Sequence, residues 1–131
     1  ATMTYSSGNV TNNTSTATSS GGGIRVCDSS TLTMTGGTIS GNKASYGGGI
    51  HVCVSSTMYF KGGSVTSNQA LANGNTGGID VNDSKFYFQG GSLTNNTCAS
   101  TCAATGLYYC NGSTYSYSSG TISGNTVVNG N

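Results

Sequence analysis

The chain has 131 residues, enough for one ordinary domain, but only 5% of them are charged, against roughly a quarter in a typical soluble protein. Its net charge of +1 offers no basic surface for nucleic acid or anionic lipid, and no apolar run approaches the roughly 18 residues of a membrane span. We therefore expect no nucleic-acid binding and no membrane insertion. Glycine supplies 22 residues, and most of the remainder is Ser, Thr and Asn. Low-complexity disorder shares such a composition, but regularly spaced apolar residues argue against it.

Five similar units follow one another along the chain, which we read as a single domain, 1–131. Aligned on a Gly-Gly bend, the units are 1–20, 21–46, 47–76, 77–105 and 106–131. The stretch 47–68 shows their order: glycines, an apolar strand, a Ser/Thr turn, a second strand, the bend, and a third apolar segment ending on Asn. The first unit is partial and begins at its second strand. Self-similarity at this period is typical of a solenoid.

Large apolar residues recur at matching positions of the predicted strands, and a spacing of two places them on one face. The first strand contributes two columns: Ile24, Ile50, Ile79 and Leu107, then Val26, Val52, Val81 and Tyr109. The second strand contributes two more: Met3, Leu32, Met58, Phe86 and Tyr115, then Tyr5, Met34, Phe60, Phe88 and Tyr117. The third contributes one: Val10, Ile39, Val65, Leu93 and Ile122. With no 3.6-residue period competing, the sequence predicts an all-β parallel β-helix, or β-solenoid, of about five rungs with three short strands each.

An Asn closes the third strand of every unit. Rungs of a parallel solenoid stack about 4.8 Å apart, so equivalent side chains lie on one another. Side-chain amides can both donate and accept along the axis, which predicts a structural Asn ladder. The alternative is that each Asn is only a turn residue. The residues concerned are Asn13, Asn42, Asn68, Asn96 and Asn125.

The glycine-rich segments also resemble a known family. GGGI at 21–24 and 47–50, and GGTISGN at 36–42, are similar to the right-handed parallel β-helix repeats of bacterial autotransporter adhesins and chlamydial polymorphic outer-membrane proteins. The likeness covers nearly the whole chain, although the fourth unit departs with GGIDVN and the fifth with GLYYCN. The resemblance implies a right-handed coil and a secreted, surface-exposed rod used in adhesion or as a stalk.

The charged residues give little support to catalysis. Arg25, His51 and Asp80 occupy the outward position of the first strand on successive rungs, where they can form a charge ladder or, alternatively, a His-Asp pair for acid-base work. No nucleophile or second carboxylate can be placed beside them. Polysaccharide lyases and glycosidases with this fold cluster their acids, but Asp28, Asp80 and Asp83 are the only acids here, and Asp80 and Asp83 alone are too few for Ca²⁺. We expect no enzyme, no metal site and no cofactor.

Cysteines and sequons predict an extracellular or cell-surface protein. Cys27 and Cys53 share a column on adjacent rungs, about 4.8 Å apart, which suits a disulfide. Cys98 and Cys102 can close a small loop, leaving Cys110 unpaired, although Cys110 can instead pair with either of them. No His column accompanies the cysteines, which argues against zinc. The glycosylation candidates are Asn9, Asn12, Asn13, Asn82, Asn95 and Asn111.

Two surface features suggest ligands. Tyr59 and Tyr87 are outward neighbours on the second strand, where they can stack on a sugar or simply stabilise the sheet. Outward threonines such as Thr33 suggest ice binding, but Tyr59, Lys61 and Tyr87 interrupt the array. The longer connections at 70–76 and 97–105 fall on one face of the solenoid, as binding loops or tolerated surface loops.

The two ends of the predicted solenoid look complementary. No amphipathic helix, charge cluster or proline protects them. The chain begins midway round a rung, and 126–131 stops where another first strand would begin. We therefore expect an extracellular structural protein that self-associates head to tail as a filament or stalk subunit. The alternatives are a piece of a longer rod, and an adhesin or carbohydrate-binding module with glycans as partners.

Overall fold

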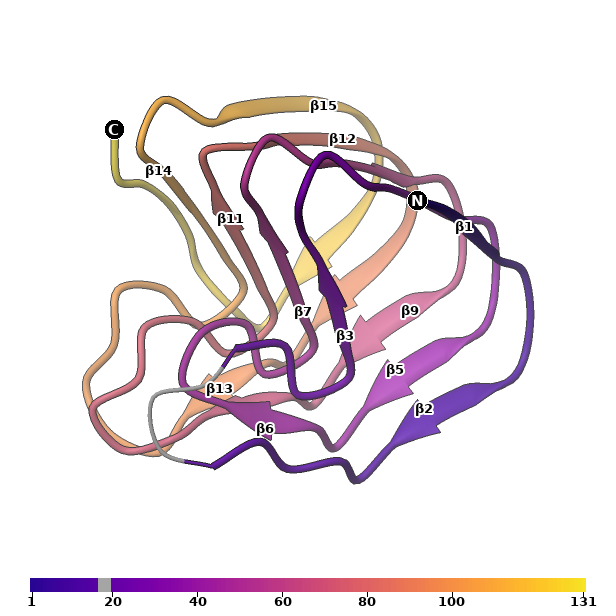
Figure 1. Cartoon of the computed structure of the whole chain (residues 1–131). Helices are drawn as coiled ribbons and strands as arrows, with labels where there is room; N and C mark the ends of the chain where they lie inside the picture. The colour runs from indigo at the N-terminus through magenta and orange to yellow at the C-terminus, as the bar shows by residue number, and fades with distance from the viewer. Residues whose placement is uncertain (17–19) are drawn as a thin grey trace.

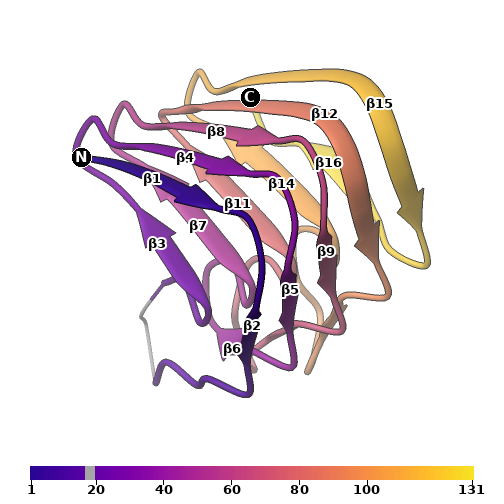
Figure 2. The ribbon, with the colours of Figure 1, turned by 90° about the vertical axis from the view of Figure 1, so that its right-hand side faces the viewer.

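The computed structural model describes residues 1–16 and 20–131, and it is a parallel β-solenoid of about four turns. The described residues form sixteen β-strands and no helix. Strands of successive turns lie side by side along the axis (Figures 1 and 2). The predicted fold class is confirmed. The sequence predicted about five rungs, and the structure has about four turns.

The first strands form one parallel five-stranded sheet in the order β16-β14-β11-β7-β3. Its register matches the sequence columns, since Ile50 pairs with both Ile24 and Ile79, and Leu107 pairs with Ile79. The strands are β3 (Ile24–Val26), β7 (Ile50–Cys53), β11 (Ile79–Asn82), β14 (Leu107–Cys110) and β16 (Val127–Asn129). The segment 126–131 was expected to stop short of another first strand; instead, its residues form that strand, because Val127 pairs with Leu107.

The second and third strands join into an eight-stranded sheet that bends at the Gly-Gly positions. Its second strands are β1 (Thr2–Tyr5), β4 (Thr31–Met34) and β8 (Thr57–Phe60), and its third strands are β2 (Asn9–Thr11), β5 (Thr38–Ser40) and β9 (Ser64–Thr66). Two long strands, β12 (Lys85–Thr94) and β15 (Thr114–Ser123), run through the bend and serve as both. The predicted second and third strands are thus continuous in the last two rungs.

A further short sheet follows the Asn positions, which corrects the expectation of three strands per rung. It contains β6 (Lys43–Ala44), β10 (Gln69–Ala70) and β13 (Thr97–Cys98), paired in parallel. Two residues are too few for an alternating pattern to reveal a strand. Ala44 and Ala70 are fully buried beneath this sheet, so it closes one corner of the core.

Side chains of equivalent positions stack inside the solenoid. Aromatic rings continue the stack through the later turns, with ring centroids 4.9 Å apart for Phe60 and Phe88 and 5.8 Å apart for Phe86 and Tyr115. Such stacked aromatic contacts add to the stabilisation from burial alone. The fully buried columns of the interior include Leu32, Met34, Ile39, Ile50, Val52, Met58, Phe60, Val65, Ile79, Val81, Phe86, Phe88, Leu93 and Leu107.

The bend requires glycine for two separate reasons. Gly63 has φ of +91°, a left-handed conformation that side chains with a Cβ rarely adopt. A Cβ at this position would also lie 2.6 Å from the carbonyl oxygen of Gly37 in the turn below. Close stacking of the turns therefore depends on the absence of a side chain here.

Candidate functional site

Asparagine side chains form a continuous hydrogen-bonded ladder along the solenoid. Asn42 Nδ2 donates to Asn68 Oδ1 at 3.0 Å, and the main-chain N–H of Asn42 donates to the same oxygen at 3.1 Å. Asn68 makes the same two bonds to Asn96, both at 3.0 Å, and its Nδ2 also donates to the carbonyl of Ile39. Asn42, Asn68 and Asn96 are buried, so these bonds satisfy polar groups that have no access to water. The ladder holds turns together rather than forming a reactive site.

A second ladder, of serines, was missed in the sequence. The main-chain N–H of Ser30 donates to Ser56 Oγ, that of Ser56 to Ser84 Oγ, and that of Ser84 to Ser113 Oγ, at 3.0 to 3.1 Å. The signal was available, because a serine stands two residues before the first apolar residue of the second strand in every unit except the first. In a chain so rich in serine, this column is easily overlooked.

Arg25, His51 and Asp80 are register partners on successive turns, as expected, but these outward positions are not all exposed. Arg25 is exposed, but His51 is only 8% exposed and Asp80 only 1%. The preceding connections cover them: Tyr46 stacks on His51 at a centroid distance of 6.2 Å, and Thr76 Oγ1 donates to Asp80 Oδ2 at 2.6 Å. The predicted alternation of inward and outward residues along these strands is correct, but an outward residue is not necessarily exposed to solvent.

His51 and Asp80 do not form a hydrogen-bonded pair. His51 Nε2 lies 3.7 Å from Asp80 Oδ1, longer than a hydrogen bond, and neither ring nitrogen of His51 has a partner among the described residues. Burial lowers the pKa of His51 below 6.5, an effect that Asp80 opposes and Arg25 reinforces. At neutral pH the ring is therefore uncharged.

The longer connections stack on one another instead of projecting separately. The N–H of Ala103 donates to the carbonyl of Asn75 at 2.9 Å, and the N–H of Asn73 donates to Ser100 Oγ at 3.3 Å. Asn75 Nδ2 also reaches Asp80 Oδ2 at 3.2 Å. The connections therefore cover the sheet of first strands, which explains the burial of Asp80.

Both expected cysteine pairs lie at disulfide distance. The Cα atoms of Cys27 and Cys53 are 4.6 Å apart, and those of Cys98 and Cys102 are 6.2 Å apart. The first pair links adjacent turns, and the second closes a loop within one connection. Cys110 is free, and its partial burial, together with Asp80, raises the pKa of its thiol, which disfavours the reactive thiolate.

The sequon asparagines differ in exposure and in the use of their amide nitrogen. Asn9, Asn12 and Asn95 are exposed, the last two with positive φ. Asn13 is exposed too, but its Nδ2 donates to Asn42 Oδ1 at 2.9 Å as part of the ladder. In the remaining pair, Asn111 Nδ2 donates to the oxygen of the half-buried Asn82, also at 2.9 Å.

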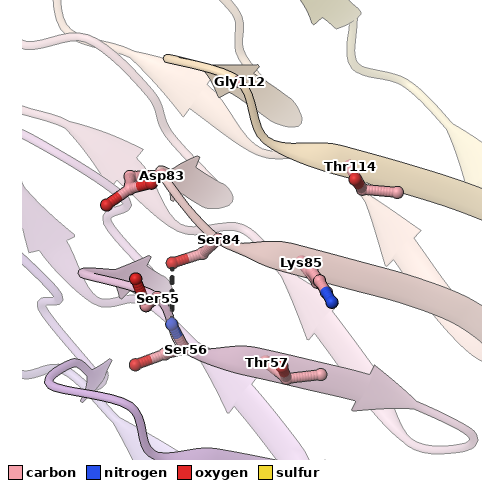
Figure 3. Close-up of a pocket in the computed structure, with 8 residues that line it drawn as sticks. All are labelled: Ser55, Ser56, Thr57, Asp83, Ser84, Lys85, Gly112 and Thr114. Carbon is pink, nitrogen blue, oxygen red and sulfur yellow. Dashed lines mark hydrogen bonds between the residues drawn. The ribbon is translucent and has the colours of Figure 1, made fainter.

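A polar hollow of about 280 Å³ lies where the turns lead from the first strands into the second (Figure 3). Ser84 stands between the carboxylate of Asp83 and the ammonium group of Lys85 in this view, and its Oγ accepts the N–H of Ser56. Both charged residues are exposed. The hollow therefore offers a carboxylate, an ammonium group and several hydroxyls. Its lining residues are Ser55, Ser56, Thr57, Asp83, Ser84, Lys85, Gly112 and Thr114.

An aromatic pair adjoins this hollow. Tyr59 and Tyr87 are register partners on β8 and β12, and their rings stack at 5.1 Å with an interplanar angle of 12°. Lys61 Nζ lies 5.9 Å from the centroid of the Tyr59 ring. Tyr87 follows Lys85 by two residues, so both project from the same face of β12. Polar and aromatic groups are thus neighbours on the outer surface.

Residues 1–16 and 20–131 contain no group of three or more His, Cys, Asp or Glu residues that could hold a metal ion. Within the same ranges there is no helix long and apolar enough to cross a bilayer. Comparisons with family models, with curated proteins and with solved structures found no match.

Proposed function

We propose that the protein is an extracellular structural protein whose solenoids stack head to tail into a filament or surface stalk. One observation carries this proposal: beside β1 lies an apolar hollow of about 230 Å³, in the place that a first strand would occupy at that level. Interior residues line it, among them Met3, Ile24, Val26 and Leu32. Open strand edges over an exposed apolar interior favour association with further strands.

The opposite end carries a strand that suits this hollow. β16 is the outermost strand of its sheet, and Val127 on it is 37% exposed. If β16 of one copy paired with β3 of the next, Val127 would continue the column of Ile24 and Ile50. The interior columns would continue in the same way, with Tyr117, 50% exposed, against Tyr5 of the next copy.

The Asn ladder adds a direction to this stacking. At each step within the chain, the N–H and Nδ2 groups of one Asn donate to Oδ1 of the Asn in the following turn. At the two ends of the ladder, Asn125 therefore presents N–H and Nδ2 donors to a following turn, and Asn13 presents an Oδ1 acceptor to a preceding turn. Head-to-tail stacking would join the two, whereas head-to-head stacking would oppose like groups.

Three features favour an extracellular setting for such a rod. Two cysteine pairs lie at disulfide distance, and disulfides persist mainly in oxidising compartments. Asn9, Asn12 and Asn95 are exposed sequon residues, as expected of a glycoprotein. The GGGI and GGTISGN segments also resemble the β-helix repeats of autotransporter adhesins and chlamydial polymorphic outer-membrane proteins. A low charge content suits a surface hydrated by hydroxyls and attached sugars.

Electron microscopy of the purified protein tests the proposal. Each of the three main strand columns contributes five layers per copy, so filaments should show an axial rise of about 24 Å, at about 4.8 Å per layer. Met3→Lys places a charge on the inward face of the exposed β1 edge and should abolish filaments. Thr4→Lys, on the outward face of the same strand, is the matched control and should leave them intact. A monomer at all concentrations in sedimentation analysis, or filaments of unchanged length in Met3→Lys, would contradict head-to-tail stacking.

A further inference from the structure

The outer surface of β12 combines an open aromatic face with polar groups. Along one register level lie Thr33, Tyr59, Tyr87 and Ser116 on successive turns. Tyr59 covers one face of the Tyr87 ring. On the other side comes Ser116, which is exposed and whose side chain is too short to cover a ring. One face of Tyr87 is therefore open above Ser116.

Polar groups border this open face at the next outward-facing level of the strands. Lys85 pairs with Thr114 in the next turn, two residues along the strands from the Tyr87 and Ser116 pair and on the same face. Both belong to the polar hollow, and Asp83 brings a carboxylate to its far side. Lys85 offers donors, Asp83 offers acceptors, and the hydroxyl of Thr114 offers both.

We propose that this surface, the Tyr87 site, binds a neutral hexopyranose chain; the site consists of Asp83, Lys85, Tyr87, Thr114 and Ser116. A pyranose ring has an apolar face of C–H groups, which stacks on the flat face of Tyr87, and a rim of hydroxyls, which bonds to the polar groups.

The charge balance and the size of the site favour this ligand class. Asp83 and Lys85 carry opposite charges, so the site has no net attraction for an anion or a cation. The adjoining hollow of about 280 Å³ is just below the roughly 300 Å³ at which pockets for drug-sized ligands begin, which suits one sugar residue. The site is open toward Ser116, so the rest of a chain can extend along the outer surface.

Sugar binding does not depend on filament formation. In a head-to-tail stack the level of Tyr87 and Ser116 would continue with Thr4 of the next copy, because Thr4 pairs with Thr33 at that level. The side chain of Thr4, like that of Ser116, is too short to cover an aromatic ring, so stacking leaves the Tyr87 face open. The site can therefore be tested on monomer or filament.

Saturation-transfer NMR with cellotetraose, maltotetraose, laminaritetraose, mannotetraose and chitotetraose at millimolar concentration tests the proposal. At least one should receive saturation, and its Kd should rise about tenfold in Tyr87→Ala, the loss expected for one aromatic stacking contact. Tyr87→Phe keeps the ring and should bind within about threefold of the original. Asp83→Asn should also weaken binding.

Tyr46→Ala is the matched control, because Tyr46 is an exposed tyrosine that stacks on His51 and lies outside the site. Its Kd should be unchanged. The proposal is overturned if none of the five oligosaccharides binds, or if Tyr87→Ala binds as tightly as the Tyr46→Ala control. Thermal unfolding of each variant verifies that it is folded, which the half-buried position of Tyr87 favours.

Discussion

Replacing Asn68 with Ala should remove the centre of the Asn ladder. Asn68 is fully buried, and its side chain makes four hydrogen bonds of 3.0 to 3.1 Å. Truncation deprives the main-chain N–H of Asn42 of its acceptor and the carbonyl of Ile39 of a donor. Each buried polar group left unsatisfied costs about 1–3 kcal/mol, so we expect Asn68→Ala to lower the free energy of unfolding by about 2–6 kcal/mol.

Guanidinium unfolding followed by circular dichroism measures this loss. Asn13→Ala is the matched control, because Asn13 belongs to the same ladder but is exposed, and water can replace its bonds. Its cost should stay below about 1 kcal/mol. Equal losses for the two variants would refute the reasoning that burial gives the ladder its strength.

The chemistry of the ladder can be separated from its shape with Asn68→Asp. The carboxylate has the size of the amide but presents an acceptor to the oxygens of Ile39 and Asn96, where Nδ2 now donates. At neutral pH we expect this variant to lose at least as much stability as Asn68→Ala. Its deficit should shrink in acid, because a protonated carboxyl regains a donor. A deficit independent of pH would contradict a role for the amide donor.

Two further changes probe the histidine and the bend. Burial lowers the pKa of His51 in the folded state, so the unfolded chain binds the proton more readily and the free energy of unfolding should fall as the pH drops below 6.5. His51→Gln should flatten this slope in unfolding curves measured between pH 7 and 5. An equally steep slope in the variant would mean that other groups cause the pH dependence. Gly63→Ala should cost more than Gly8→Ala, since both positions have positive φ but only Gly63 would bring a Cβ to 2.6 Å from the oxygen of Gly37, whereas nothing lies within 4 Å at Gly8. In Gly8→Ala, backbone strain alone should lower the free energy of unfolding by about 1–2 kcal/mol. Equal melting temperatures for Gly8→Ala and Gly63→Ala would contradict this prediction, because they would mean that the turns move apart at Gly63 without cost.

The interior of the solenoid could be predicted because each inward residue mainly contacts its own kind. Ile50 lies between Ile24 and Ile79, so one sequence column corresponds directly to one spatial column. The same logic places Cys27 beside Cys53 and Asn42 beside Asn68. Because the units stack in register, residues that align between units are also neighbours in space.

The candidate site was only partly visible in this way. Tyr59 and Tyr87 were recognisable as neighbours, because they share a column. The polar hollow beside them was not recognisable, because its shape depends on turns that differ between units. Asp83, for example, has φ of +49° in a turn that is one residue shorter than the turn at Ser55 in the preceding unit. Local geometry of this kind has no periodic signature.

By itself, the sequence determined the parallel stack, its register, its cysteine neighbours and its Asn ladder, since all of these follow from repeated spacing. Only the tertiary structure decided the environment of the outer surface. His51 and Asp80 occupy strand positions equivalent to Arg25, yet Tyr46 covers His51 and Thr76 bonds to Asp80, so both are buried, whereas Arg25 is exposed. The physical reason is that inward residues contact equivalent residues of the neighbouring units, whereas outward residues contact the connections between strands, where the units differ.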